Sequence, residues 1–135
     1  MIQRVQSIYL TLVVICVALY VNTSFIVVDN IGIKAIESTS LTAVSLINAL
    51  MVIVCVFMFK KRKVQMNICW AGIVGSSVTT TLTLLEFYNH IATTAAGKHF
   101  SFGIAFPFLM IVFFVLAYNG IKKDDQLVKS MDRLR

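Results

Sequence analysis

The sequence predicts an all-α membrane protein with four transmembrane helices. Hydrophobic residues make up 59% of the 135 residues, charged residues make up 13%, and the mean hydropathy is +0.87. A soluble domain carries about 25% charged residues. The apolar residues lie in long blocks that lysines and arginines flank. The net charge of +6 is therefore explained better by membrane topology and anionic lipid headgroups than by nucleic acid.

Four apolar segments are expected to cross the membrane, at about residues 8–28, 41–59, 68–88 and 102–118. Each segment is close to the ~20 residues that a helix needs to span a hydrocarbon core of ~30 Å. Helices are expected because each segment must satisfy its own backbone hydrogen bonds in lipid. The chain then divides into a transmembrane domain, residues 1–120, and a cytoplasmic tail, residues 121–135.

The distribution of lysine and arginine predicts the orientation of these segments. Ten of the twelve basic residues lie before the first segment, between the second and third, or in the tail. The other two loops contain only Lys34 and Lys98. Because basic residues are retained on the cytoplasmic side, both termini and the central basic loop are expected in the cytoplasm. The outer loops, about residues 29–40 and 89–101, are too short for a soluble catalytic domain.

The third segment is rich in glycine, serine and threonine. Gly72 and Gly75 allow close approach of another helix, and the hydroxyl groups can hydrogen-bond across helices. This helix is therefore expected to face protein rather than lipid, either within its own bundle or against a partner. Asn48 of the second segment is a candidate polar contact for it. A hydrophilic pore lining is the alternative interpretation.

Glu86 is the only acidic residue within a predicted span, and His90 follows it on the same helix face. Ionisable groups inside a membrane are costly and often mark ion or proton pathways. This pair predicts an alternative function, a small oligomeric transporter or channel with an ion or proton site near its outer mouth. Glu86 also lies close enough to the outer interface for its carboxylate to reach water, so a purely structural role remains open.

The tail has the pattern of an amphipathic helix. Leu127, Met131 and Leu134 recur at spacings of four and three residues, and charged residues occupy the other face. Gly120 is expected to break this helix from the last membrane segment. Such a helix can lie on the inner headgroups or dock on a cytoplasmic partner.

Basic residues from three parts of the chain are expected to form one cytoplasmic surface. A protein, anionic lipid or RNA could bind it, but the acidic Asp124, Asp125 and Asp132 among the basic residues favour a protein. We do not expect a nucleic acid partner. The candidate contact residues are Arg4, Lys60, Lys61, Arg62, Lys63, Lys122, Lys123, Leu127, Met131, Arg133 and Arg135.

The sequence contains no motif for catalysis or cofactor binding. It has no Gly-rich phosphate loop, no HExxH, and no pair of carboxylates within a span. Cys16, Cys55 and Cys69 lie in or beside apolar blocks without a CxxC spacing, which indicates packing. We therefore expect no enzyme activity, no cofactor and no metal site. The leading hypothesis is an accessory or scaffold subunit of a larger inner-membrane complex, in contact with lipid, other membrane subunits or copies of itself.

Three segments carry a family resemblance. They are the opening MIQRVQSIYL, the central FKKRKVQMNIC and the closing AYNGIKKDDQLVKSMDRLR. The chain resembles domain of unknown function 4293, a family of small four-span membrane proteins found in Bacteroidota. The resemblance extends over the whole chain and implies a four-helix inner-membrane protein. It implies no activity, substrate or catalytic residue.

Overall fold

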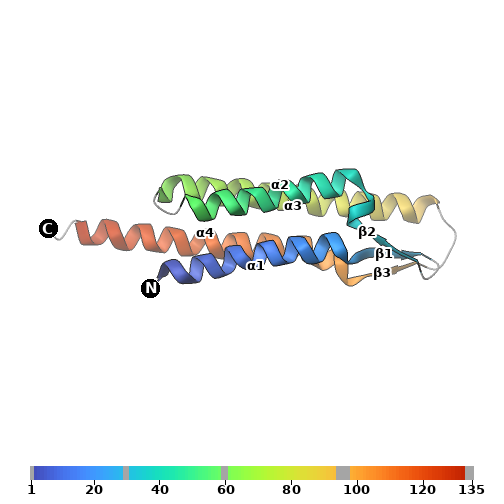
Figure 1. Cartoon of the computed structure of the whole chain (residues 1–135), viewed down its shortest axis with the longest axis horizontal. Helices are drawn as coiled ribbons and strands as arrows, with labels where there is room; N and C mark the ends of the chain where they lie inside the picture. The colour runs from blue at the N-terminus through green and yellow to red at the C-terminus, as the bar shows by residue number, and fades with distance from the viewer. Residues whose placement is uncertain (1, 29–30, 59–60, 94–97, 133–135) are drawn as a thin grey trace.

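The structure is a computed structural model that describes residues 2–28, 31–58, 61–93 and 98–132, with residues 2–6, 28, 31, 91–93, 98–100 and 131–132 described by their backbone alone. These residues form an elongated helical bundle with a small sheet at one end (Figure 1). The helices of the described residues are α1 (Ile2–Asn22), α2 (Thr39–Phe57), α3 (Arg62–Thr93) and α4 (Ala105–Asp132).

The helices pack as a closed ring. Helix α1 contacts α2 and α4, and α3 contacts the same two helices from the other side. Neighbouring helices run antiparallel (Figure 1). The start of α1, the end of α2, the start of α3 and the end of α4 therefore lie together, at what we term the basic end. The opposite end, which contains the strands, is termed the sheet end.

The sheet end contains strands that the sequence analysis did not predict. Strand β1 (Ser24–Val28) lies between β2 (Ile31–Lys34) and β3 (Lys98–Phe100), and both pairings are antiparallel. A Cβ atom at Gly103 would lie 2.4 Å from the carbonyl oxygen of Ser24, so the 3-10 helix η2 (Phe102–Ile104), just before α4, approaches β1 closely. The sheet therefore joins the end of α1 to the start of α4.

The predicted first span, residues 8–28, was too long at its C-terminal end. Helix α1 ends at Asn22, and the following Ser24–Val28 is strand β1 rather than helix. Its sequence, SFIVV, consists mainly of β-branched and aromatic residues, which favour a strand when partners pair on both sides. An apolar run does not by itself distinguish these two structures.

The expected break at Gly120 is absent, because α4 continues through this glycine to Asp132 as one helix. Glycine inside a helix costs only about 1 kcal/mol relative to alanine. Ile121 is 1% exposed, so the core-facing stripe of α4 continues past the glycine. Tertiary packing thus compensates for the weak helix propensity. Through Asp132 the amphipathic tail is an extension of α4, and Leu134 of its predicted apolar stripe lies outside the described residues.

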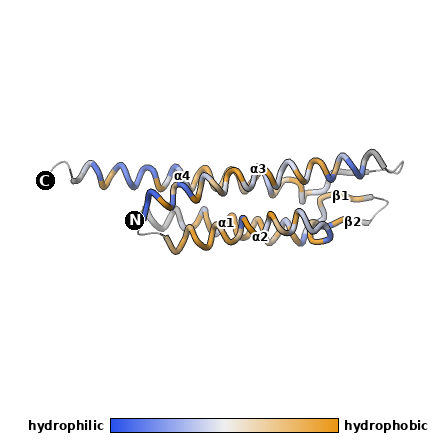
Figure 2. The backbone as a smooth tube through the Cα atoms, turned by 90° about the horizontal axis from the view of Figure 1, so that it is seen from above, coloured by the Kyte–Doolittle hydropathy of each residue, from blue (hydrophilic) through white to orange (hydrophobic). Residues whose placement is uncertain are grey.

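The outer surface of the bundle is strongly apolar. Within the described residues, α2, α3 and α4 are long and apolar enough to cross a membrane, whereas the apolar part of α1, Ser7–Asn22, is shorter. Figure 2 shows hydrophobic residues along the helices and a hydrophilic end of α4. Many leucine, isoleucine and valine side chains point outward, while several serine and threonine side chains are buried. This arrangement agrees with a membrane protein.

Candidate functional site

The basic end is held together by an ion pair between α3 and α4. Arg62 Nη2 lies 3.1 Å from Asp124 Oδ2, and the two side chains are 25% and 15% exposed. Arg62 Nη1 also donates a hydrogen bond to the Asp124 carbonyl oxygen at 3.3 Å. Arg62 was predicted as a partner contact, and that stays a prediction beside this internal ion pair. It fixes α4 just beyond the part of the helix that packs in the bundle.

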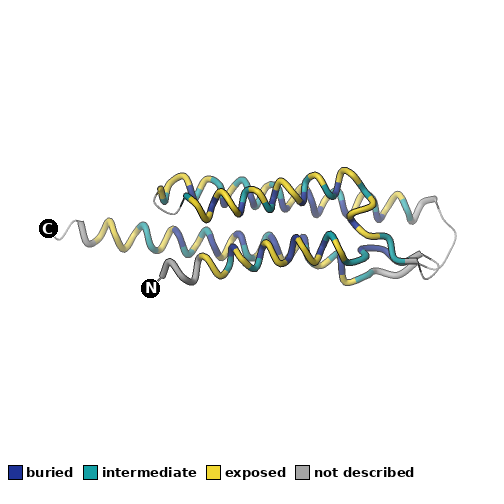
Figure 3. Tube along the Cα trace, viewed as in Figure 1, coloured by how far each residue is buried: buried dark blue, intermediate teal, exposed yellow. Residues whose placement is uncertain are grey.

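Beyond Asp124, α4 extends past the other helices (Figure 1). Leu127 is 49% exposed and Val128 is 39% exposed. Lys129 forms an ion pair with Asp125 one turn earlier. Figure 3 shows mostly exposed positions along this stretch. The end of α4 is therefore an exposed helix with apolar and charged side chains.

Four of the other predicted contact residues are exposed at the basic end: Lys61, Lys63, Lys122 and Lys123. Arg4 lies on α1 and Met131 on α4, both described by backbone alone. Lys60, Arg133 and Arg135 lie outside the described residues.

A polar cluster lies in the core on the sheet side of the bundle. Tyr20 Oη of α1 and Thr83 Oγ1 of α3 are hydrogen-bonded at 2.6 Å. Asn48 Nδ2 of α2 donates to Thr79 Oγ1 at 3.0 Å, which confirms the polar contact predicted for Asn48. Thr79 and Thr83 also donate to carbonyl groups one turn earlier in α3. These hydrogen bonds connect α1 and α2 to α3 in the core.

The small residues of α3 face the bundle itself. A Cβ atom at Gly72 would lie 2.4 Å from Cε1 of Phe114 on α4. One at Gly75 would lie 2.5 Å from Oδ1 of Asn48 on α2. The prediction of close helix approach is confirmed, and the neighbours are helices of the same chain.

Two buried polar atoms in this cluster have no hydrogen-bond partner among the described residues, Asn48 Oδ1 and Ser76 Oγ. Buried polar groups are usually paired, so each lowers the stability of the core. The oxygen of Asn48 lies against Gly75, where a larger residue would displace it.

Glu86 and His90 lie at the sheet end, on one face of α3 as predicted. Ser38 Oγ donates a hydrogen bond to Glu86 Oε1 at 3.3 Å. Both Glu86 and His90 are half-buried. The Ser38 contact joins α3 to the start of α2, which is a structural role for the carboxylate. Whether the pair also binds an ion stays a prediction.

A family comparison now decides the relationship of the chain. The profile described as Domain of unknown function (DUF4293) matches residues 2–134. The chain belongs to this family. The resemblance carried by the opening, central and closing segments is thereby confirmed. No curated protein and no solved structure matched.

In this DUF4293 protein, sequence reasoning also missed two further side-chain contacts. Cys55 Sγ of α2 and Cys69 Sγ of α3 lie 3.5 Å apart, and both thiols are buried. The rings of Trp70 and Tyr118 meet edge to face, with centroids 6.2 Å apart. Neither pair has a signature in the sequence, because the helices that bring the residues together were not assigned as neighbours. Both pairs pack α3 against adjacent helices near the basic end.

Proposed function

We propose that the chain is a four-pass protein of a bacterial inner membrane, with both termini and the basic end in the cytoplasm. The described basic residues at the basic end support this orientation; they are Arg4, Lys61, Arg62, Lys63, Lys122, Lys123 and Lys129. Helix α1 lies between α2 and α4 in the ring, and its outward side chains include Ile8, Ile15 and Leu19. A helix with these neighbours and this apolar surface would share the same lipid layer, although its apolar part is shorter.

Within this topology, the proposed function is that of a non-enzymatic accessory or scaffold subunit of a larger membrane complex. The observation that carries it is the extension of α4, which exposes Leu127 and Val128 beyond the bundle (Figure 3). Apolar side chains on an otherwise charged, exposed helix favour a helix that docks in a groove of another protein.

The chemistry of the partner follows from the charges around this helix. Lys122 and Lys123 are exposed at its base. An apolar groove with an acidic rim on a cytoplasmic protein would complement both features. The Arg62–Asp124 ion pair holds the base of the extension, and α4 is continuous into the membrane bundle. A pre-oriented helix loses less freedom on binding, which suits a scaffold.

The proposal is tested by purifying tagged full-length chain from its native membrane in mild detergent. We expect a second protein to copurify in fixed proportion. Leu127→Glu should lower its recovery about tenfold, the effect of losing ~1.4 kcal/mol at one interface residue. Quantitative mass spectrometry of the eluate measures this ratio.

Gln126→Glu is the matched control, because it adds the same charge at the neighbouring exposed residue. It should leave the recovery unchanged. Recovery of this chain alone, as a homo-oligomer, would contradict the accessory function. Equal losses in both variants would show that charge rather than apolar contact governs docking. The alternative of a transporter with Glu86 and His90 stays a prediction, since no described contact tests transport.

A further inference from the structure

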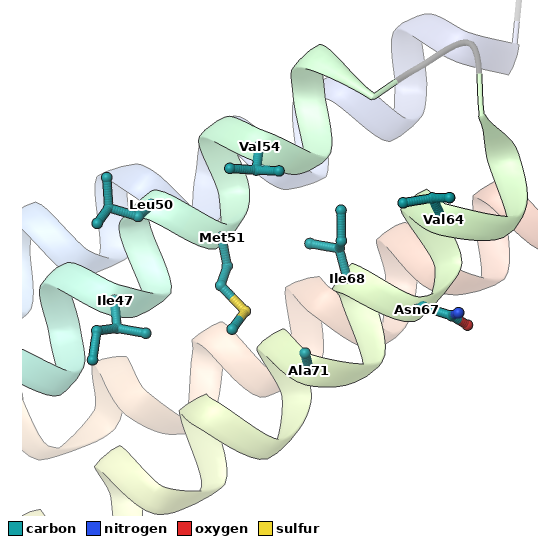
Figure 4. A pocket seen from close by; sticks show the side chains of 8 residues that line it. All are labelled: Ile47, Leu50, Met51, Val54, Val64, Asn67, Ile68 and Ala71. Atoms are coloured by element: carbon teal, nitrogen blue, oxygen red, sulfur yellow. The ribbon is translucent and has the colours of Figure 1, made fainter.

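A groove follows the seam between α2 and α3 at the half of the bundle nearer the basic end (Figure 4). Its volume is about 490 Å³ and its lining is almost entirely apolar. Figure 4 shows side chains of both helices along it, with Met51 and Ile68 between the two backbones. The lining residues are Ile47, Leu50, Met51, Val54, Val64, Asn67, Ile68 and Ala71.

The walls of the groove face outward from the bundle. Ile47, Leu50 and Val54 are among the exposed large hydrophobic residues of α2. They belong to a helix that is long and apolar enough to cross a membrane. The groove therefore opens toward the hydrocarbon layer once the bundle is inserted, and its occupant must be apolar along most of its length.

One end of the groove lies beside basic residues. Val64 and Asn67 line this end, but the amide of Asn67 points away from α2 and contributes almost no surface to the groove (Figure 4). Lys63 is exposed and directly precedes Val64. Lys61 is also exposed, immediately before α3. The ion pairs found among the described residues at this end use Arg62 and Lys129, and Lys63 also acts electrostatically on the carboxylate of Asp125 in α4.

We propose that this groove binds one anionic glycerophospholipid. An acyl chain lies between α2 and α3, and the phosphate contacts Lys61 and Lys63. Apolar walls that end in basic residues at the membrane surface complement an apolar chain that ends in a negative group. This inference rests on the proposed membrane insertion of the bundle and is independent of the cytoplasmic partner of α4.

A transmembrane helix of another protein fits the groove less well. Helix contacts in membranes favour small residues that let the backbones approach. Among the lining residues only Ala71 is small, and the walls carry isoleucine, leucine, valine and methionine. A flexible acyl chain can follow such an irregular surface, whereas these large side chains keep the backbone of another helix from approaching closely.

The test uses the purified full chain in mild detergent with equal amounts of dioleoylphosphatidylglycerol and dioleoylphosphatidylcholine. Intact-complex mass spectrometry counts the adducts of each lipid. We expect one retained phosphatidylglycerol per chain. The double substitution Lys61→Gln with Lys63→Gln should lower the preference for phosphatidylglycerol about thirtyfold, since each basic residue near a membrane surface changes affinity about fivefold.

Two further variants separate the groove from general surface charge. Lys122→Gln with Lys123→Gln removes two exposed charges at the same end of the bundle but outside the groove, and should leave the preference unchanged. Ala71→Phe fills the groove and should abolish retention of both lipids. Circular dichroism confirms that each variant retains its helical content before it is compared.

Three results would overturn the proposal. Equal retention of both lipids would show that the basic residues do not select the headgroup. An unchanged preference after the Lys61 and Lys63 substitutions would place the anionic site elsewhere. A photo-crosslinker at Ala71 that captures a protein rather than lipid would assign the groove to a partner helix. The Leu127→Glu experiment tests only the docking function of α4. Its outcome does not affect the lipid site proposed here.

Discussion

At the scale of single residues, the core of this bundle depends on glycine positions that face large or polar side chains. Gly72 lies under Phe114, which is fully buried, and Gly75 lies under Asn48. A well-packed core gives a buried ring little room to move. The space for Phe114 therefore exists only because residue 72 has no Cβ.

Gly72→Ala should destabilise the protein by about 1–3 kcal/mol, the usual cost of overpacking a core. The physical reason is the 2.4 Å approach between the added Cβ and Cε1 of Phe114. Unfolding in mixed micelles with increasing denaturing detergent, followed by circular dichroism, measures the loss.

A double-substitution cycle provides the control for this prediction. Phe114→Leu in the Gly72→Ala background should recover part of the lost stability, because the smaller side chain leaves room for the methyl group. Additive effects of the two substitutions would contradict the contact, since residues that touch are expected to couple.

At this scale the sequence was informative where polar residues in an apolar helix indicate the side that faces the bundle core. The clustered glycine, serine and threonine residues of the third segment predicted its protein-facing side, and Asn48 was identified as their contact. Tyr20 was not identified, although its hydroxyl bonds to Thr83 at 2.6 Å. An aromatic residue in a membrane segment packs equally well against lipid or protein, so its type alone does not indicate its side.

At the scale of elements, the main difference between expectation and structure concerns where helices end. Gly120 and the run after Asn22 were each interpreted from local sequence. Tertiary contacts decide both: Ile121 continues the packed stripe of α4, and β1 gains partners on two sides. Differences in helix or strand propensity between residue types are smaller than the free energy that such packing contributes.

The Arg62–Asp124 ion pair predicts a measurable coupling between α3 and the extension of α4. Because both side chains are partly exposed, the interaction should contribute about 1 kcal/mol or less. Arg62→Ala should therefore increase hydrogen exchange of the α4 amides after residue 124 up to about fivefold. Hydrogen-exchange mass spectrometry in detergent measures this change.

The partner substitution Asp124→Ala should have the same effect, and the double variant should add little to either. Lys129→Ala removes the more exposed ion pair within α4 and should change exchange less. Exchange that is equal in the Arg62 variant and the unmodified protein would show that packing alone holds the extension.

At the scale of the whole molecule, charge distribution was the most informative feature of the sequence. It predicted that the start of the chain, the central loop and the tail gather on one side, and the bundle brings the helix ends beside them together (Figure 1). The order of packing could not be predicted. In lipid, apolar side chains suit the outside as well as the core, so hydrophobicity does not identify which faces meet.

The opposite positions of the basic end and the sheet end yield a prediction for topology. Single cysteines are introduced at Gln3 on α1, Lys34 on β2 and Lys122 on α4, in a chain whose native thiols are buried. A membrane-impermeant maleimide should label Lys34→Cys from the periplasmic side. Gln3→Cys and Lys122→Cys should react only after the inner membrane is opened, because the basic residues around them favour the cytoplasm.

The variant at Gln3 decides whether α1 crosses the bilayer. If the shorter apolar part of α1 does not span, Gln3→Cys and Lys34→Cys should react from the same side, and the chain has three passes. If Gln3→Cys and Lys122→Cys react from the same side, the result supports four passes. Helix α1 packs between α2 and α4 and must then cross the membrane with them. Labelling of Lys122→Cys from the periplasm would reverse the whole orientation and remove α4 from reach of any cytoplasmic partner.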